Sequence, residues 1–162
     1  MSPELTSLYA ILLGLLGPAP IGEPNVNMPD RLILRSGSQI VAIGDSITQA
    51  GGYLKDVDAV LATRYADLRL PPIVNVGISG QKAEDLVFRF ERDVVAKKPA
   101  IVTISVGIND VWHRVGEPND PQVLAKYWAN VSRMVDMAQK AGITVILLSP
   151  TVIGENSEAS AN

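Results

Sequence analysis

From Gln39 onward, short apolar runs alternate with segments in which apolar residues recur at helical spacing. The apolar runs predict strands at residues 39–43, 73–76, 101–106 and 144–148, and the helical pattern predicts helices between them at residues 52–65, 83–96 and 121–141. The strands are apolar along their length, so both faces of the sheet must be covered. We therefore expect an α/β fold, a three-layer α/β/α sandwich with a parallel sheet. Ligands of such folds bind beyond the carboxyl ends of the strands.

Each predicted helix carries an apolar face for packing. The faces consist of Tyr53, Leu54, Val57, Val60, Leu61 and Tyr65 in the first helix, Leu86, Val87, Phe90 and Val94 in the second, and Leu124, Tyr127, Val131, Met134, Val135 and Ala138 in the third. The third set is expected to point inward. The two tryptophans, Trp112 and Trp128, are interpreted as packing residues.

The first 37 residues have a different pattern. Residues 8–17 read LYAILLGLLG, too short for a membrane-spanning helix of about 20 residues but typical of the apolar part of a secretory signal. The preceding residues include Glu4 and no Lys or Arg, and a helix packed on the domain is the alternative. We expect a signal-like segment and linker at 1–37, one domain at 38–162, and a secreted or periplasmic location, with a cytoplasmic one as the alternative.

Composition narrows the possible chemistry. Of the 162 residues, 47% are hydrophobic and 19% charged, and the net charge is -3, which describes a globular domain without the basic surface of a nucleic-acid binder. The absence of cysteine excludes disulfides, thiolate metal sites, a thiol nucleophile and a lipid-modified cysteine anchor. We expect no nucleic-acid partner and no stable membrane anchor.

Small polar clusters follow the first three predicted strands. They read GDSIT at 44–48, NVGISGQ at 75–81 and GIND at 107–110, and parallel strands place them at one edge of the sheet. Ser46 supplies a hydroxyl, Gly80 an N–H that a ligand can approach closely, and Asn109 a side-chain NH2. A hydroxyl beside such donors is what acyl transfer through an oxyanion requires. Alone, Ser46 would be interpreted as the cap of the following helix.

Together these three clusters resemble the first three motif blocks of the SGNH (GDSL-type) hydrolases, in order and each at the end of a strand. The resemblance implies a flavodoxin-like esterase or acylhydrolase fold, Ser46 as nucleophile, and an oxyanion hole formed by the Ser46 amide, the Gly80 amide and the Asn109 side chain. It also implies that Asp45 and Asp110 brace their turns, and that neither metal nor organic cofactor is needed. The expected substrate is a small ester such as an acetylated sugar.

The family also carries an Asp-x-x-His block, which supplies the general base and follows a fifth strand. The literal match in this sequence is Asp110 to His113, the single histidine. It directly follows Asn109, which makes one segment responsible for both the base and the oxyanion donor. We therefore interpret the chain as the N-terminal portion of such an enzyme, a poor catalyst by itself. Its fourth strand, 144–148, would then be an uncovered apolar edge prone to association.

Three alternatives stay open. His113 could serve as the base. Asp45, Asn109, Asp110 and His113 could form a metal site, although they do not make a closed ligand set. The third alternative is a non-catalytic module that retains the oxyanion hole to bind a carbohydrate or a carboxylate. A nucleotide-binding domain is disfavoured, because no Gly-x-Gly-x-x-Gly or Walker-type lysine follows the first strand.

Overall fold

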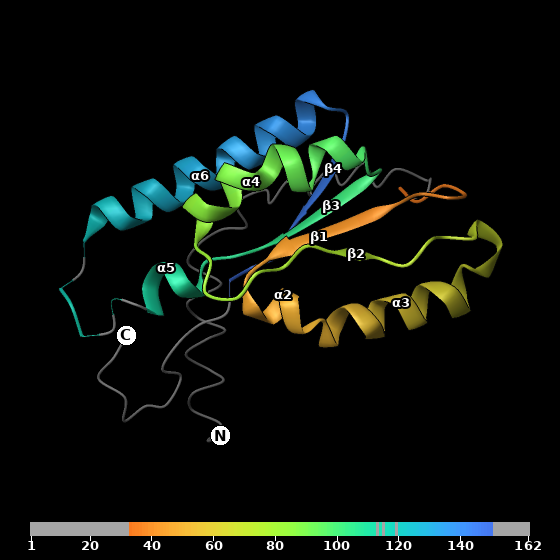
Figure 1. Cartoon of the computed structure of the whole chain (residues 1–162), viewed down its shortest axis with the longest axis horizontal. Coiled ribbons are helices and arrows are strands. Elements are labelled where there is room, and N and C mark those ends of the chain that lie inside the picture. The colour runs from red at the N-terminus through yellow and green to blue at the C-terminus, as the bar shows by residue number, and fades with distance from the viewer. Residues whose placement is uncertain (1–32, 113, 115, 119, 151–162) are drawn as a thin grey trace, which may run out of the picture. The chain divides into compact units, whose positions relative to one another are not determined.

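The computed structural model describes residues 33–112, 114, 116–118 and 120–150. Its four strands form one parallel sheet in the order β2-β1-β3-β4 (Figure 1). The strands are β1 (Ile40–Gly44), β2 (Val74–Asn75), β3 (Ile101–Ser105) and β4 (Thr144–Leu147). Each lies within, or one residue beyond, an apolar run that predicted it. The parallel α/β fold is therefore confirmed.

Helices connect the strands in the predicted order. They are α2 (Ser46–Ala50), α3 (Gly52–Arg64), α4 (Ala83–Asp93), α5 (Ile108–Trp112) and α6 (Pro121–Lys140), with 3-10 turns η1 (Ala66–Leu68) and η2 (Val95–Lys97). The three long helices confirm the predicted ones. The five-residue helices α2 and α5 were not predicted, because so short a segment carries no readable helical period.

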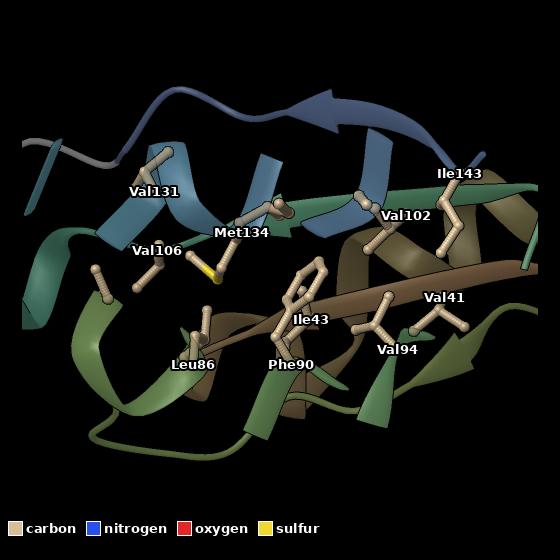
Figure 2. Packing of buried hydrophobic residues seen from close by; sticks show 13 residues of the cluster. Val41, Ile43, Leu86, Phe90, Val94, Val102, Val106, Val131, Met134 and Ile143 are labelled. Carbon is tan, nitrogen blue, oxygen red and sulfur yellow. The ribbon is translucent and has the colours of Figure 1, made fainter. Parts of the chain in front are cut away.

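The main core lies between one face of the sheet and the helices α4 and α6 (Figure 2). Strand residues such as Val41, Ile43 and Ile104 meet Phe90 from α4 and Met134 from α6, and all five are fully buried. α2 and α3 lie on the other face of the sheet (Figure 1). β1 and β3 are the central strands of the sheet, so the residues that follow them start from the middle of the core.

Several predicted packing residues are instead exposed. Leu124 is 60% exposed. The helix α6, with 20 residues, is longer than the four-residue β4 and the five-residue β3, and its first turn lies beyond these strands. On α3, Val57 and Val60 are more than two-fifths exposed, and Leu54 is the buried residue of that helix. Trp112 and Trp128 are both more than half exposed, so their interpretation as packing residues is wrong.

β4 pairs with β3 and, within the described residues, with no other strand. Ile146 and Leu147 are 43% and 47% exposed. The described part of the chain therefore has the apolar edge that we expected, whereas the association that such an edge invites stays a prediction.

The apolar segment at residues 8–17 and the linker as far as residue 32 lie outside the described residues. The signal-like interpretation and the boundary at 38 stay predictions. No helix in the described ranges is both long and apolar enough to cross a bilayer.

Candidate active site

The first motif forms a tight turn from β1 into α2. Asp45 is buried and caps the helix, since its carboxylate accepts a hydrogen bond from the Ile47 amide at 3.0 Å. Ser46 is the first residue of α2 and is exposed. The predicted bracing role of Asp45 matches this contact. Asp45 caps α2, so the alternative that Ser46 is merely a cap, which the three motifs together disfavoured, does not hold. Amides in the first turn of a helix have no intrahelical acceptor, so the Ser46 N–H can serve a ligand.

The second motif is hydrogen-bonded to the first. The Asn75 side chain donates to the Thr48 carbonyl at 2.6 Å and accepts from the Gly77 amide at 2.9 Å. The Ser79 amide donates to Oε1 of Gln49 at 2.7 Å. The Ile78 amide donates to the Gly44 carbonyl at 3.0 Å. The turn after β2 is thereby fixed against α2 through contacts on both sides of Ser46.

Gly80 lies at the exposed end of this turn. Its φ of +76° is a backbone conformation that glycine adopts without strain. A Cβ built there would meet nothing within 4 Å, so the space beside this residue is open. Within the described residues, no group accepts a hydrogen bond from the Gly80 amide. The amide is therefore free to donate to a ligand oxygen.

The third motif joins the same cluster through α5. Nδ2 of Asn109 donates to the Gln81 carbonyl at 3.0 Å. The side-chain amide of Asn109 therefore lies next to the residue that follows Gly80. The second hydrogen of that NH2 group remains for another acceptor. The Asp110 carboxylate accepts from the Ala83 amide at the start of α4, at 3.2 and 3.3 Å. This matches the bracing role predicted for Asp110.

Burial determines the electrostatics of the third motif. Removal from water raises the pKa of Asp110, although the Ala83 amide favours its charged form. The Tyr127 hydroxyl donates to the Val106 carbonyl at 3.2 Å. Its pKa is raised by burial and, second, by the Asp110 charge.

The raised pKa of Asp110 predicts a pH-dependent stability. The folded protein holds this proton more tightly than the unfolded chain, so the stabilisation is complete below the unfolded pKa of about 3.9 and is lost as the pH rises through the folded pKa. Asp110→Asn keeps an oxygen for the Ala83 amide and does not ionise. Urea unfolding from pH 3.5 to pH 7 should therefore show the variant gaining stability relative to wild type as the pH rises. A constant difference would contradict this.

The roles predicted for His113 and for the three catalytic candidates stay predictions. His113 lies outside the described residues. The alternatives in which His113 is a general base or a metal ligand therefore stay open. Among the described residues, no group of three or more acidic or histidine side chains could hold a metal ion. The catalytic roles of Ser46, Gly80 and Asn109 stay predictions, although hydrogen bonds join their segments.

Sequence reasoning missed a buried cation. Arg89, on α4, is 4% exposed and contacts segments on both sides of the cluster. The sequence did carry a signal for this burial. Arg89 lies beside Phe90 and three residues after Leu86, within the apolar face of the predicted helix. Asp93, one turn later, is a suitable partner for its charge.

Comparison with known proteins identifies the family. Residues 42–162 match the sequence profile of the GDSL-like Lipase/Acylhydrolase family. The chain is 35% identical to an acetylxylan esterase of Geobacillus stearothermophilus, over 76% of this chain and 64% of the esterase. It is 31% identical to a Bacillus subtilis (strain 168) protein named uncharacterized lipoprotein YqeF, over 71% of this chain and 49% of that protein. The chain thus spans 64% and 49% of these relatives' lengths.

Solved structures agree with this assignment. The crystal structure of the Geobacillus esterase matches with a TM-score of 0.69 at 33% identity, over 80% of this chain and 67% of that chain. A second acetyl xylan esterase, AlAXEase, matches with a TM-score of 0.64 at 34% identity, over 75% of this chain and 63% of that chain. Catalytic mutants of the Geobacillus enzyme carry alanine in place of a serine, an aspartate or a histidine. With most of its length matched and its parallel sheet shared, the chain belongs to the GDSL-like lipase/acylhydrolase family, as its SGNH motifs indicate.

Proposed function

We propose that this chain carries the nucleophile and the oxyanion hole of a serine esterase that acts on small acyl esters. One observation carries the proposal: the segments containing Ser46, Gly80 and Asn109, far apart in sequence, are hydrogen-bonded into one cluster at the carboxyl ends of parallel strands. In α/β sheets of this kind, that edge is where ligands bind.

The reaction assigned to this cluster has two steps. The Ser46 oxygen attacks the ester carbonyl carbon, a general base takes the serine proton, and the alcohol leaves with a proton as the acyl-enzyme forms. Water then hydrolyses the acyl-enzyme. In both steps, negative charge develops on the carbonyl oxygen. The Ser46 amide, the Gly80 amide and the Asn109 side chain are the donors that stabilise it.

We propose that the substrate is an acetylated carbohydrate, whose acetyl ester is the bond cleaved. Two relatives are named acetylxylan esterases. Trp112 ends α5, the helix that carries Asn109, and is 57% exposed. An exposed aromatic ring there is suited to contact a sugar ring. The apolar run at residues 8–17 and a relative named as a lipoprotein support an exported location, where polysaccharide is encountered.

The 162-residue chain by itself should hydrolyse esters slowly. Their single histidine, His113, follows the proposed oxyanion donor, and no other Asp-x-x-His is present to supply the base. A serine esterase without its base retains a rate enhancement of about 10³–10⁴ over water. Added imidazole should therefore act as an external base and accelerate Ser46 chemistry.

The test is covalent labelling of the chain with a fluorophosphonate, with and without imidazole, followed by mass spectrometry of the labelled peptide. We expect one label per chain, on Ser46, forming faster with imidazole, and none in Ser46→Ala. Ser46→Ala, treated with the same reagent and imidazole, shows whether any labelling occurs at another residue.

Two other outcomes of the labelling experiment would contradict this assignment. If wild type and Ser46→Ala label alike, Ser46 is not a nucleophile. Calorimetric binding of acetate or an acetylated sugar would then favour the non-catalytic binding module. Fast labelling that is insensitive to imidazole and lost in His113→Ala would identify His113 as the base.

A further inference from the structure

Arg89 lies between the first and second motif segments. Its guanidinium donates from Nε to Oε1 of Gln81 at 2.6 Å, from Nη1 to the Val76 carbonyl at 2.7 Å, and from Nη2 to the Gly44 carbonyl at 3.3 Å. Gly44 ends β1 directly before the proposed nucleophile turn, and Val76 follows β2. One side chain therefore contacts two neighbouring strand ends and the loop that follows the second.

The neighbours of these acceptors form the proposed site. Gly44 is two residues before Ser46, and Gln81 directly follows Gly80. The Gln81 carbonyl accepts from Nδ2 of Asn109. Gln81 thus links Arg89 to Asn109, because its side-chain oxygen accepts from the first and its main-chain carbonyl accepts from the second. Each proposed oxyanion donor is thus within two residues, or one hydrogen bond, of a group that Arg89 contacts.

Burying a guanidinium is costly, and an apolar side chain of similar volume often stabilises a core as well or better. Asp93 offsets part of this cost, with an ion pair to Arg89 at 2.9 Å. Asp93 stays ionised because a hydrogen bond from Arg92, with a further one from Arg89, holds its pKa at about 2. The other donors of Arg89 go to the loops rather than to carboxylates, which points to a role in geometry.

We propose that Arg89 is a positioning residue for the oxyanion hole, holding the Gly44 and Gln81 segments at the spacing that the three donors require. Arg89 is too buried to touch a substrate and acts through Gln81 and Gly44. This inference rests on the proposed esterase function, because it assigns a purpose to the same cluster.

Matched variants separate positioning from stability. Arg89→Met removes the donors, and Gln81→Leu removes only the loop acceptor. Gln81→Glu retains an oxygen for Nε. The control is Arg92→Met, because Arg92 also pairs with Asp93, at 2.6 Å, but is 73% exposed and donates to no loop group among the described residues. Unfolding midpoints are measured for all four variants.

Two measurements then follow. The first is the rate of Ser46 labelling by a fluorophosphonate in imidazole, and we expect it to fall about 10- to 100-fold in Arg89→Met and Gln81→Leu. Gln81→Glu should recover most of the wild-type rate, and Arg92→Met should stay within about twofold of it. The second is the NMR signals of the Gly80 amide and the Asn109 side-chain NH2. Both should shift in Arg89→Met but not in Arg92→Met. Gln81→Leu is left out of this comparison, because a substitution next to Gly80 shifts its amide signal by itself.

The proposal is overturned if Gln81→Leu labels at the wild-type rate, because Arg89 would then only clamp α4 to the sheet. Should Arg89→Met fail to fold, the comparison of Gln81→Leu with Gln81→Glu still decides. Should wild-type Ser46 fail to label, the proposed function is wrong, and the NMR signals alone test whether Arg89 positions the loops.

Discussion

Alanine at position 77 is expected to lower the free energy of unfolding by about 3 kcal/mol, since inserting an atom into a filled space displaces its neighbours. A Cβ at Gly77 would lie 2.7 Å from the Thr48 carbonyl carbon and 2.9 Å from the Gln49 Cα, and closer still to the Gln49 nitrogen. These are main-chain atoms of α2, so no side-chain rotation relieves the contact. The turn after β2 would have to move away from the nucleophile turn.

The control for this substitution is Gly52→Ala. Gly52 begins α3, and a Cβ there would meet nothing within 4 Å. Alanine favours the helix by up to about 1 kcal/mol over glycine, so the melting temperature should stay the same or rise slightly. Calorimetry of the two variants decides the matter, because Gly77→Ala should melt on the order of 10 °C lower. Equal melting temperatures for the two variants would show that the turn containing Gly77 is not in close contact with α2 in solution.

Removing the Asn109 side chain is expected to slow Ser46 acylation about 10²- to 10³-fold, the usual effect of losing one oxyanion-hole donor. The reason is geometric: one hydrogen of its NH2 goes to the Gln81 carbonyl at 3.0 Å, which leaves the other for the substrate oxygen. Asn109→Asp should be at least as slow as Asn109→Ala, because a carboxylate has nearly the same shape but no N–H and repels the developing charge.

Acetyl ester hydrolysis in imidazole, with the Ser46→Ala rate subtracted, provides the measurement. The donor acts in the transition state, so kcat should fall while KM changes little. Asn130→Ala, in the middle of α6, is the matched asparagine control and should keep the wild-type rate. If Asn109→Ala keeps kcat and raises KM alone, Asn109 binds substrate without stabilising the oxyanion.

Local pattern predicted the strands and long helices well, because their signal is repeated over many residues. The helix predicted at 121–141 is α6 (Pro121–Lys140), and the strand predicted at 101–106 is β3 (Ile101–Ser105). The pattern did not reveal α2 and α5. α2 depends on a side-chain cap from Asp45, and α5 carries Asn109 and Asp110, which contact the turn after β2 and the start of α4.

Burial was predicted less well than secondary structure. An apolar stripe shows which face of a helix turns inward, but not how much of that face finds a partner. Met134 and Leu124 belong to the same stripe of α6, yet one is fully buried and the other 60% exposed. The difference depends on which turns of the helix lie over the sheet, and that is a property of the packed structure.

The order of the elements, the parallel sheet and the positions of three polar motifs at strand ends can be predicted from local sequence, because each is encoded by neighbouring residues. The contacts between the motifs appear only in the folded chain: Asn75 and Gln49 join the first two motifs, Asn109 donates to Gln81, and Arg89 donates to Gly44, Val76 and Gln81. Such contacts depend on strand register and helix placement. They arise from the burial of the whole core, and no local stretch of sequence specifies them.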